Sequence, residues 1–309
     1  MFLFNLVEKR KTYFIISGTI IGLGILAMIY SYITTGSPFL LGVDFRGGAR
    51  FEIQFTEPVT ESAVEEVFTE AGVTNPSIIA LRGEDLQNAW QIRTEPVTPD
   101  EVQAIEARLS ELAPLVPNST QVDSVSGTVA GEVTNSAFIA VLVAAVIILV
   151  YIMVVFRQVP NPFRYGACAV AAMLHDLFVI FGVAALTGMI LGWEVDALFL
   201  TAVLTVAGFS LQDTIVVFDR IRENINKRPL ERYERVVNRS ILETIHRSLA
   251  TQLNAMFIMV AILLFGGASI KPFIAILFVG LLSGTYSSIF TAVPLLVAWE
   301  KNEIPFLKA

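Results

Sequence analysis

The chain has 309 residues, of which 54% are hydrophobic and only 16% are charged. A soluble domain carries about 25% charged residues, so this composition excludes an ordinary soluble protein and favours a membrane protein. The single cysteine, Cys168, lies in an apolar run, where it cannot form an internal disulfide, which argues against redox chemistry. With a net charge of −7 and no cysteine-based ligand set, we expect neither a metal site nor a nucleic-acid partner.

Six hydrophobic stretches are long enough to cross a bilayer, which takes about 20 residues for each helix. They run near residues 13–33, 136–156, 165–187, 197–219, 247–266 and 272–299. The first follows basic residues, as the apolar region of a signal peptide does, but it is too long for one and no small-x-small cleavage site ends it. We therefore expect a retained anchor.

The basic residues beside these stretches predict the orientation of the chain, because such residues stay on the cytoplasmic side. Residues 9–11 precede the first span, Arg157 and Arg164 flank the loop after the second, and a basic run over 220–239 follows the fourth. The sequence therefore predicts a multi-pass membrane protein with both termini in the cytoplasm and its large loop outside.

The large loop, residues 38–135, has the pattern of a small α+β domain. Apolar and polar residues alternate from Ala49 to Phe55, which is typical of a half-buried strand, and a helix is expected over 60–71. Two strands follow over 77–81 and 89–93, around a turn at 83–88. A capping box from Thr98 to Glu101 then opens a helix to Leu112, and a strand is expected over 121–129.

The order βαββαβ is that of a split, ferredoxin-like unit, which hosts many functions. The expected fold is therefore an α-helical polytopic membrane protein with six transmembrane helices and an extracytoplasmic α+β domain between helices 1 and 2. The predicted parts are residues 1–37 for the cytoplasmic N-terminus and helix 1, 38–135 for the α+β domain, and 136–309 for helices 2–6 with their loops.

Asp213 lies well inside the fourth hydrophobic stretch, with Ser210, Gln212 and Thr214 beside it. A carboxylate at that depth costs about 2.5–3.5 kcal/mol on insertion scales, and such residues usually mark ion or proton pathways. Because the ionisation of a carboxyl group responds to burial and to nearby charges, small rearrangements could load or release a proton there. The alternative is a static ion pair that holds helices together.

Arg247 follows His246 at the start of the fifth span, on the same side of the membrane as the end of the fourth. Its charge is effectively permanent, so Arg247 would tune Asp213, if the two helices pack together, rather than exchange protons itself. Polar neighbours at this depth indicate a hydrated seam or interhelical hydrogen bonds; they are Thr244, Ser248, Thr251, Gln252 and Asn254.

His175 and Asp176 lie near the middle of the third span. Adjacent residues on a helix point about 100° apart, so the two cannot face one partner equally. A second acid in the membrane supports a proton relay, but Asp176 may equally serve to orient its neighbours, and the sequence leaves both roles open.

Two further motifs are rich in small residues. The run Gly42-Val43-Asp44-Phe45-Arg46-Gly47-Gly48 after the first span indicates either a tight junction between membrane and domain or an ordinary surface turn. In the last span, Gly280, Gly284 and Ser288 recur every four residues on one helix face. This spacing favours close packing against another helix, either within the chain or in a second subunit.

Together these motifs resemble those of the SecF family. Residues 41–48 resemble its GxDFxGG signature, and the pairs His175-Asp176 and His246-Arg247 match its elements in spans three and five. Residues 208–224 resemble its span-four signature, G-Y/F-S-L-N-D-T-hydrophobic-D-R-I-R-E-N, with Gln212 as a modest departure that keeps polarity. The signature positions are Gly42, Asp44, Phe45, Gly47, Gly48, Gly208, Ser210, Asp219, Arg220, Arg222 and Glu223.

The resemblance covers essentially the whole chain and implies a non-enzymatic subunit of the bacterial cytoplasmic (inner) membrane, in the resistance-nodulation-division-like superfamily. It implies a heteromer with SecD, attachment to the SecYEG channel, often with YajC, and use of the proton-motive force to help translocate preproteins across the lipid bilayer. The family's proton-pathway aspartate and arginine map to Asp213 and Arg247. The energy source implied is the proton gradient, without a cofactor, and the sequence contains no G-x-x-x-x-G-K-[ST] loop for ATP.

Three other functions compete with this interpretation. Asp176 and Asp213 on two spans would suit an intramembrane aspartyl protease, but Asp213 lies in a Ser-Leu-Gln-Asp run rather than in a G-x-G-D element. An exporter of small solutes or lipids usually has twelve spans, so this chain would need to form a homodimer. A purely structural subunit, with SecD carrying the protons, is the third alternative.

Overall fold

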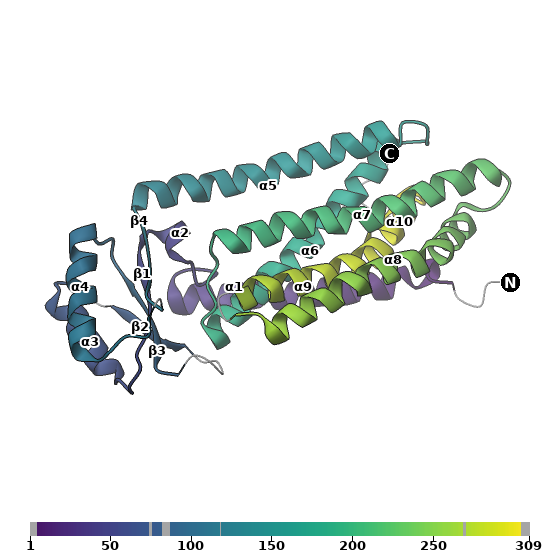
Figure 1. The fold of residues 1–309 in the computed structure, drawn as a ribbon. Helices are drawn as coiled ribbons and strands as arrows, with labels where there is room; N and C mark the ends of the chain where they lie inside the picture. The colour runs from purple at the N-terminus through teal and green to yellow at the C-terminus, as the bar shows by residue number, and fades with distance from the viewer. Residues whose placement is uncertain (1–4, 74–75, 82–86, 118, 268–269, 304–309) are drawn as a thin grey trace. The chain divides into compact units, whose positions relative to one another are not determined.

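The computed structural model describes residues 5–73, 76–81, 87–117, 119–267 and 270–303 (Figure 1). The chain forms two compact units. The helical unit comprises Met1–Phe39, Ile139–Trp193 and Leu198–Ala309, and the α+β unit comprises Leu40–Phe138 together with Glu194–Ala197. The short segment Glu194–Ala197 therefore belongs to the α+β unit although it lies between two membrane-length helices, an assignment that the sequence did not predict.

Among the described residues, six helices are long and apolar enough to cross a membrane, as predicted. The first five are α1 (Arg10–Thr35), which follows the short turn Val7–Lys9, α5 (Gly127–Val155), α6 (Pro162–Leu191), α7 (Ala197–Lys227) and α8 (Tyr233–Phe265). The sixth is made of α9 (Lys271–Ser287), a π-helical turn (Ser288–Ala292) and α10 (Val293–Glu300). A π-helical turn inserted in an α-helix is found mostly at functional sites.

Helix α8 begins at Tyr233, well before the apolar stretch predicted from residue 247. Its added N-terminal turns carry Val237 and Ile241, which are buried in the main core of the helical unit together with Val7. Because this segment packs only one apolar side, it is too polar to be recognised as part of a membrane span, although its helical hydrogen bonds continue.

The centre of the helical unit is formed by α6, α7 and the last span. Half or more of the positions in their most apolar parts are buried, whereas in α5 only 6% are. Helix α1 packs on α6 where Gly24 meets Gly182, because two glycines allow the helix backbones to approach closely.

We expect Gly182→Ala to destabilise the helical unit by about 1–3 kcal/mol. A Cβ at this position would lie 2.6 Å from the Gly24 Cα, and since that atom is backbone, α1 and α6 must separate. Gly208→Ala is the matched control, because no atom lies within 4 Å of its added Cβ. Alanine's better helix propensity should make the control neutral or stabilising by up to about 1 kcal/mol. Thermal unfolding in detergent compares them, and equal melting temperatures would contradict the packing argument.

In the α+β unit, the described residues form a four-stranded antiparallel sheet in the order β2-β3-β1-β4, which confirms the ferredoxin-like prediction. Its elements are β1 (Gly48–Gln54), α3 (Glu61–Glu70), β2 (Ser77–Leu81), β3 (Ala89–Thr94), α4 (Pro99–Leu112) and β4 (Gln121–Val125). Most of the predicted turn at 83–88 lies outside the described residues. The domain core joins the sheet to both helices through buried side chains such as Phe51, Phe68 and Leu109.

Local signals in the sequence explain the helix starts of this domain. Thr98 and Glu101 form the predicted capping box of α4, and Thr60 caps α3 through its side chain. The prediction of a last strand over 121–129 is wrong at its end, because β4 stops at Val125 and α5 begins at Gly127. The hydroxyl of Ser126 accepts a hydrogen bond from the Val129 amide at 3.4 Å and so favours the helix at this point.

Candidate functional site

Asp176, on α6, is completely buried and its carboxylate accepts hydrogen bonds from two other helices. Ser210 of α7 donates at 2.6 Å, and Ser283 and Ser287 of α9 donate at 2.6 and 2.7 Å. Buried polar groups are costly in a low-dielectric environment unless they are paired, so these three hydroxyls make the carboxylate tolerable there. The result is a polar joint between α6, α7 and α9.

His175 adds a fourth polar group to this joint. Its Nδ1 lies 3.1 Å from an Asp176 carboxylate oxygen, so the neighbouring side chains interact directly despite the angle between them. The imidazole is stacked near Tyr286, and its Nε2 is buried without a hydrogen-bond partner among the described residues. These contacts surround Asp176 with donors, an arrangement that supports the role of orienting its neighbours.

The small residues of the last span make this joint possible. A Cβ at Gly284 would lie 3.3 Å from the Ser210 Cα, and one at Gly280 would collide with Val206. Ser288 turns its hydroxyl back to the Gly284 carbonyl at 2.5 Å, at the start of the π-helical turn. Their neighbour is therefore α7 of the same chain.

Asp213 lies three residues after Ser210 on α7 and is also buried. Its carboxylate accepts a hydrogen bond from the Gln252 side-chain amide of α8 at 2.7 Å. Ser248, one turn earlier on α8, is buried and contributes to the polar surroundings of the carboxyl group. Two neighbouring buried acids thus have separate environments: serine hydroxyls and a histidine around Asp176, and a carboxamide beside Asp213.

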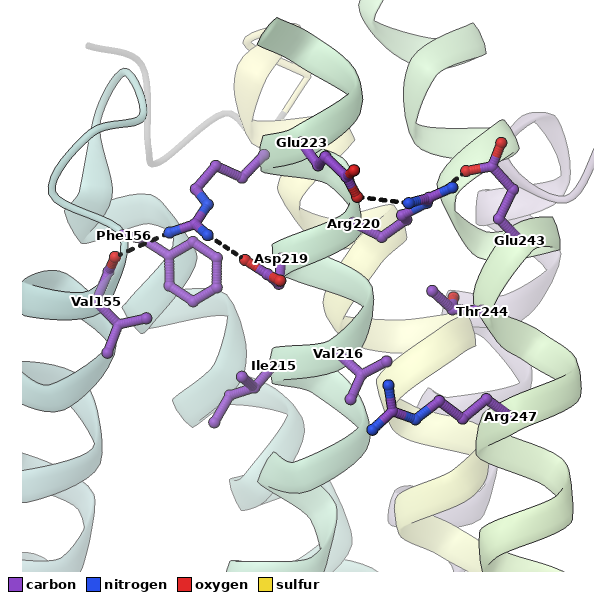
Figure 2. A pocket seen from close by; sticks show the side chains of 11 residues that line it. Val155, Phe156, Ile215, Val216, Asp219, Arg220, Glu223, Glu243, Thr244 and Arg247 are labelled. Atoms are coloured by element: carbon purple, nitrogen blue, oxygen red, sulfur yellow. Dashed lines mark hydrogen bonds and ion pairs between the residues drawn. The ribbon is translucent and has the colours of Figure 1, made fainter. Parts of the chain in front are cut away.

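Arg247 does not contact Asp213 in this structure, so the pairing expected from the sequence is not observed. Figure 2 shows its side chain extending from α8 toward Val216 of α7, where it lines a cavity of about 590 Å³. The guanidinium forms no ion pair or hydrogen bond with the part of the chain that the structure describes. The reason is geometric: Ser248 and Gln252 are four residues apart and share one helix face, whereas Arg247 points about 100° away from Ser248.

The charged residues at the end of α7 are paired with one another or with α8 (Figure 2). Arg220 binds Glu223 at 2.5 Å and Glu243 of α8 at 2.6 Å. Arg222 binds Asp219 at 2.6 Å. These pairs form one wall of the cavity at Arg247 and match the expectation of interfacial pairing.

The glycine-rich signature forms the entry to the α+β domain. Residues Val43–Arg46 make the short helix α2, after which Gly47 and Gly48 adopt φ values of 75° and 117°. At Gly48 a Cβ would also lie only 2.5 Å from the Thr94 carbonyl oxygen, so β1 can begin there only with glycine. The Phe45 carbonyl accepts a hydrogen bond from Thr134 at 3.4 Å.

Glu194 and Val195 are site residues that the sequence did not identify. Both belong to the short loop between α6 and α7, and both contact the signature segment or the sheet of the α+β unit. The one available signal was a glutamate flanked by Trp193 and Val195 in a loop with few basic residues. That signal does not predict a partner in β3.

Membrane-length helices with two buried acids on central spans, joined to a small α+β domain, define a polytopic membrane protein whose polar chemistry lies inside the helical unit. Residues 104–302 match the family model described as protein export membrane protein SecD/SecF, C-terminal, and residues 32–59 match the SecD/SecF GG motif. The chain belongs to the SecF family of protein translocase subunits.

Relatives and solved structures agree with this assignment. The protein translocase subunit SecF of Anaerolinea thermophila is 39% identical over 302 residues, covering 97% of this chain and 95% of the relative. SecF of Thermobaculum terrenum is 42% identical and covers 85% of both chains. The crystal structure of the translocon-associated membrane protein SecDF from Thermus thermophilus matches 97% of this chain with a TM-score of 0.78 at 28% identity. This chain spans 40% of that longer protein.

Proposed function

We propose that this chain associates with SecD and couples the proton-motive force to late steps of polypeptide translocation through SecYEG, with YajC as a further partner. The observation that carries the proposal is Asp213. It is a buried acid on a central membrane helix, held by a neutral amide rather than by a fixed positive charge. An acid that is not locked in an ion pair can change its protonation state without losing its partner.

In the proposed mechanism, the proton on Asp213 decides which group of α8 it binds. A protonated carboxyl group suits the Gln252 amide, which is the partner in this structure. After proton release, the negative charge attracts the free guanidinium of Arg247, and α7 and α8 shift to bring the two together. One charge crossing 100 mV supplies about 2.3 kcal/mol, enough to bias two states of similar free energy.

Asp176 has a different role in this proposal. Its carboxylate is surrounded by hydroxyl donors from two helices, and it keeps α7 and α9 in place while Asp213 exchanges protons. Asp176 and Asp213 bind different partners, which speaks against the shared, water-activating pair of an aspartyl protease. The purely structural subunit differs from this proposal in one respect, namely whether Asp213 titrates during export.

The proposed orientation places both termini and the loops after the second and fourth spans in the cytoplasm. The α+β domain then faces the outside of a bacterial inner membrane, where the translocating polypeptide emerges. The paired arginines at the end of α7, Arg220 and Arg222, lie on the cytoplasmic side in this arrangement, as the distribution of positive charges favours.

The function is tested with inverted membrane vesicles that contain the translocation channel and SecD, with and without this chain. We expect the chain to co-purify with SecD, and we expect its addition to restore the proton-gradient-stimulated part of preprotein translocation. Restoration of SecD levels without any gradient stimulation would support the purely structural subunit instead.

A further inference from the structure

The loop between α6 and α7 is joined to the start of the α+β domain as an additional strand rung. Val195 donates its amide to the Leu40 carbonyl, and its own carbonyl accepts from the Gly42 amide, both at 2.8 Å. Leu41 and Val195 thereby form a parallel bridge. Gly42 fits this approach because an added Cβ would lie 3.1 Å from a Glu194 carboxylate oxygen and 3.3 Å from the Val195 carbonyl oxygen.

Asp44 connects the same segment to the first residue of α7. Its carboxylate accepts a hydrogen bond from the Ala197 amide at 2.9 Å. The first amides of a helix lack partners within the helix, and an acidic side chain satisfies them and interacts favourably with the helix dipole. Here the capping side chain comes from 153 positions away in the sequence, so the cap also links two distant segments.

An ion pair completes these contacts on the sheet. Arg93 of β3 donates from Nε to Glu194 at 2.6 Å, its Nη2 lies 2.5 Å from the same oxygen, and the Gln91 amide also binds there. The Glu194 side chain is only 5% exposed. Burial raises the pKa of Glu194, and the charge of Arg93 opposes this effect, so the ionised carboxylate depends on its partner in β3.

We propose that Gly42, Asp44, Arg93 and Glu194 form a clasp that stays closed during the transport cycle and fixes the α+β domain to the start of α7. Helix α7 runs without a break from Ala197 to Lys227 and carries Asp213. At about 1.5 Å per residue, Asp213 lies about 24 Å along the helix from the clasp. A shift of α7 at Asp213 therefore moves the domain directly, without a flexible loop between them. This coupling role rests on the proposed function.

The closed clasp is tested with the double variant Leu41→Cys/Val195→Cys in membranes that contain the whole complex. Because the two residues are bridge partners, we expect a disulfide to form readily on oxidation. The native Cys168 is buried, so the unmodified chain is the control for unspecific cross-linking. We expect oxidised and reduced vesicles to show the same gradient-stimulated translocation. A loss on oxidation that reduction reverses would show that the clasp must open and would overturn the proposal.

Asp44→Ala and Asp44→Asn test the link to α7, since asparagine caps a helix about as well as aspartate and alanine does not. Hydrogen exchange should show that the Ala197 amide loses protection in Asp44→Ala and keeps it in Asp44→Asn. We expect a several-fold loss of gradient stimulation in the alanine variant only, with normal amounts of complex and normal ATP-driven initiation. Lost protection with unchanged stimulation would overturn the coupling role.

Asp213→Asn, measured in the same vesicles, separates this inference from the proposed function. If Asp213→Asn keeps full stimulation, the proton role of Asp213 fails. The clasp is then still supported or refuted by the Ala197 exchange and by the effect of the Leu41–Val195 cross-link. If Asp213→Asn loses stimulation while Asp44→Ala does not, the function stands and the clasp fails.

Discussion

Asp176→Ala is expected to destabilise the helical unit by about 3 kcal/mol and to lower the amount of folded protein in membranes. The change removes the acceptor shared by Ser210, Ser283 and Ser287 and leaves a space between three helices. Each stranded buried donor costs about 1–3 kcal/mol in water-soluble proteins. Interhelical hydrogen bonds in membranes average only about 0.6 kcal/mol, and serines can donate to their own helix, so the total stays below the simple sum.

Asp176→Asn is the matched control, because it keeps the size of the side chain and one acceptor oxygen. Thermal unfolding in detergent should place it between the wild type and Asp176→Ala. If it unfolds like the wild type and yet abolishes gradient stimulation, then Asp176 belongs to a proton relay. Wild-type stability of Asp176→Ala would show that the polar joint does not hold α6, α7 and α9 together.

Arg247→Gln is expected to remove the gradient-stimulated part of translocation while changing stability by less than about 0.5 kcal/mol. The small stability effect follows because the guanidinium has no ion pair or hydrogen bond to any residue within the described ranges and faces a cavity. The large functional effect follows because glutamine cannot supply the charge that stabilises ionised Asp213 in the second state. Vesicle translocation and thermal unfolding measure the two effects separately.

Arg247→Lys tests whether charge alone is sufficient at this position. Lysine keeps the positive charge but not the planar, bidentate geometry, so we expect partial stimulation. Full activity of Arg247→Gln would contradict the partner exchange. A stability loss as large as that of Asp176→Ala would show that Arg247 has a structural role instead.

The fold could be read from the sequence where the signal was local. Alternation from Ala49 to Phe55 indicated β1, and the capping box at Thr98 and Glu101 placed the start of α4 correctly. The end of β4 was predicted too late, because β-favouring residues continue past Ser126 into the first turn of α5. Hydrophobicity located the spans but missed the first turns of α8, which are buried on one side only.

The site was harder to predict because it depends on which helix faces meet. Asp213 stood out as an acid in an apolar stretch, but its partner was expected to be Arg247. The four-residue spacing of Ser248 and Gln252 was the better guide, since both lie on the buried face of α8. The contacts of Asp44 and Glu194 join segments that are distant in the sequence, and a single sequence contains no signal for such pairs.

The most direct test of the account is proton-gradient-dependent preprotein translocation into inverted vesicles that contain this chain and its SecD partner, with the wild type and Asp213→Asn compared at equal expression. Asparagine keeps the size of the side chain and can still bind Gln252, but it cannot carry a proton. We expect Asp213→Asn to lose the gradient-stimulated part of translocation, with ATP-driven initiation intact. Unchanged stimulation would make Asp213 a structural polar residue and would assign the proton chemistry to SecD.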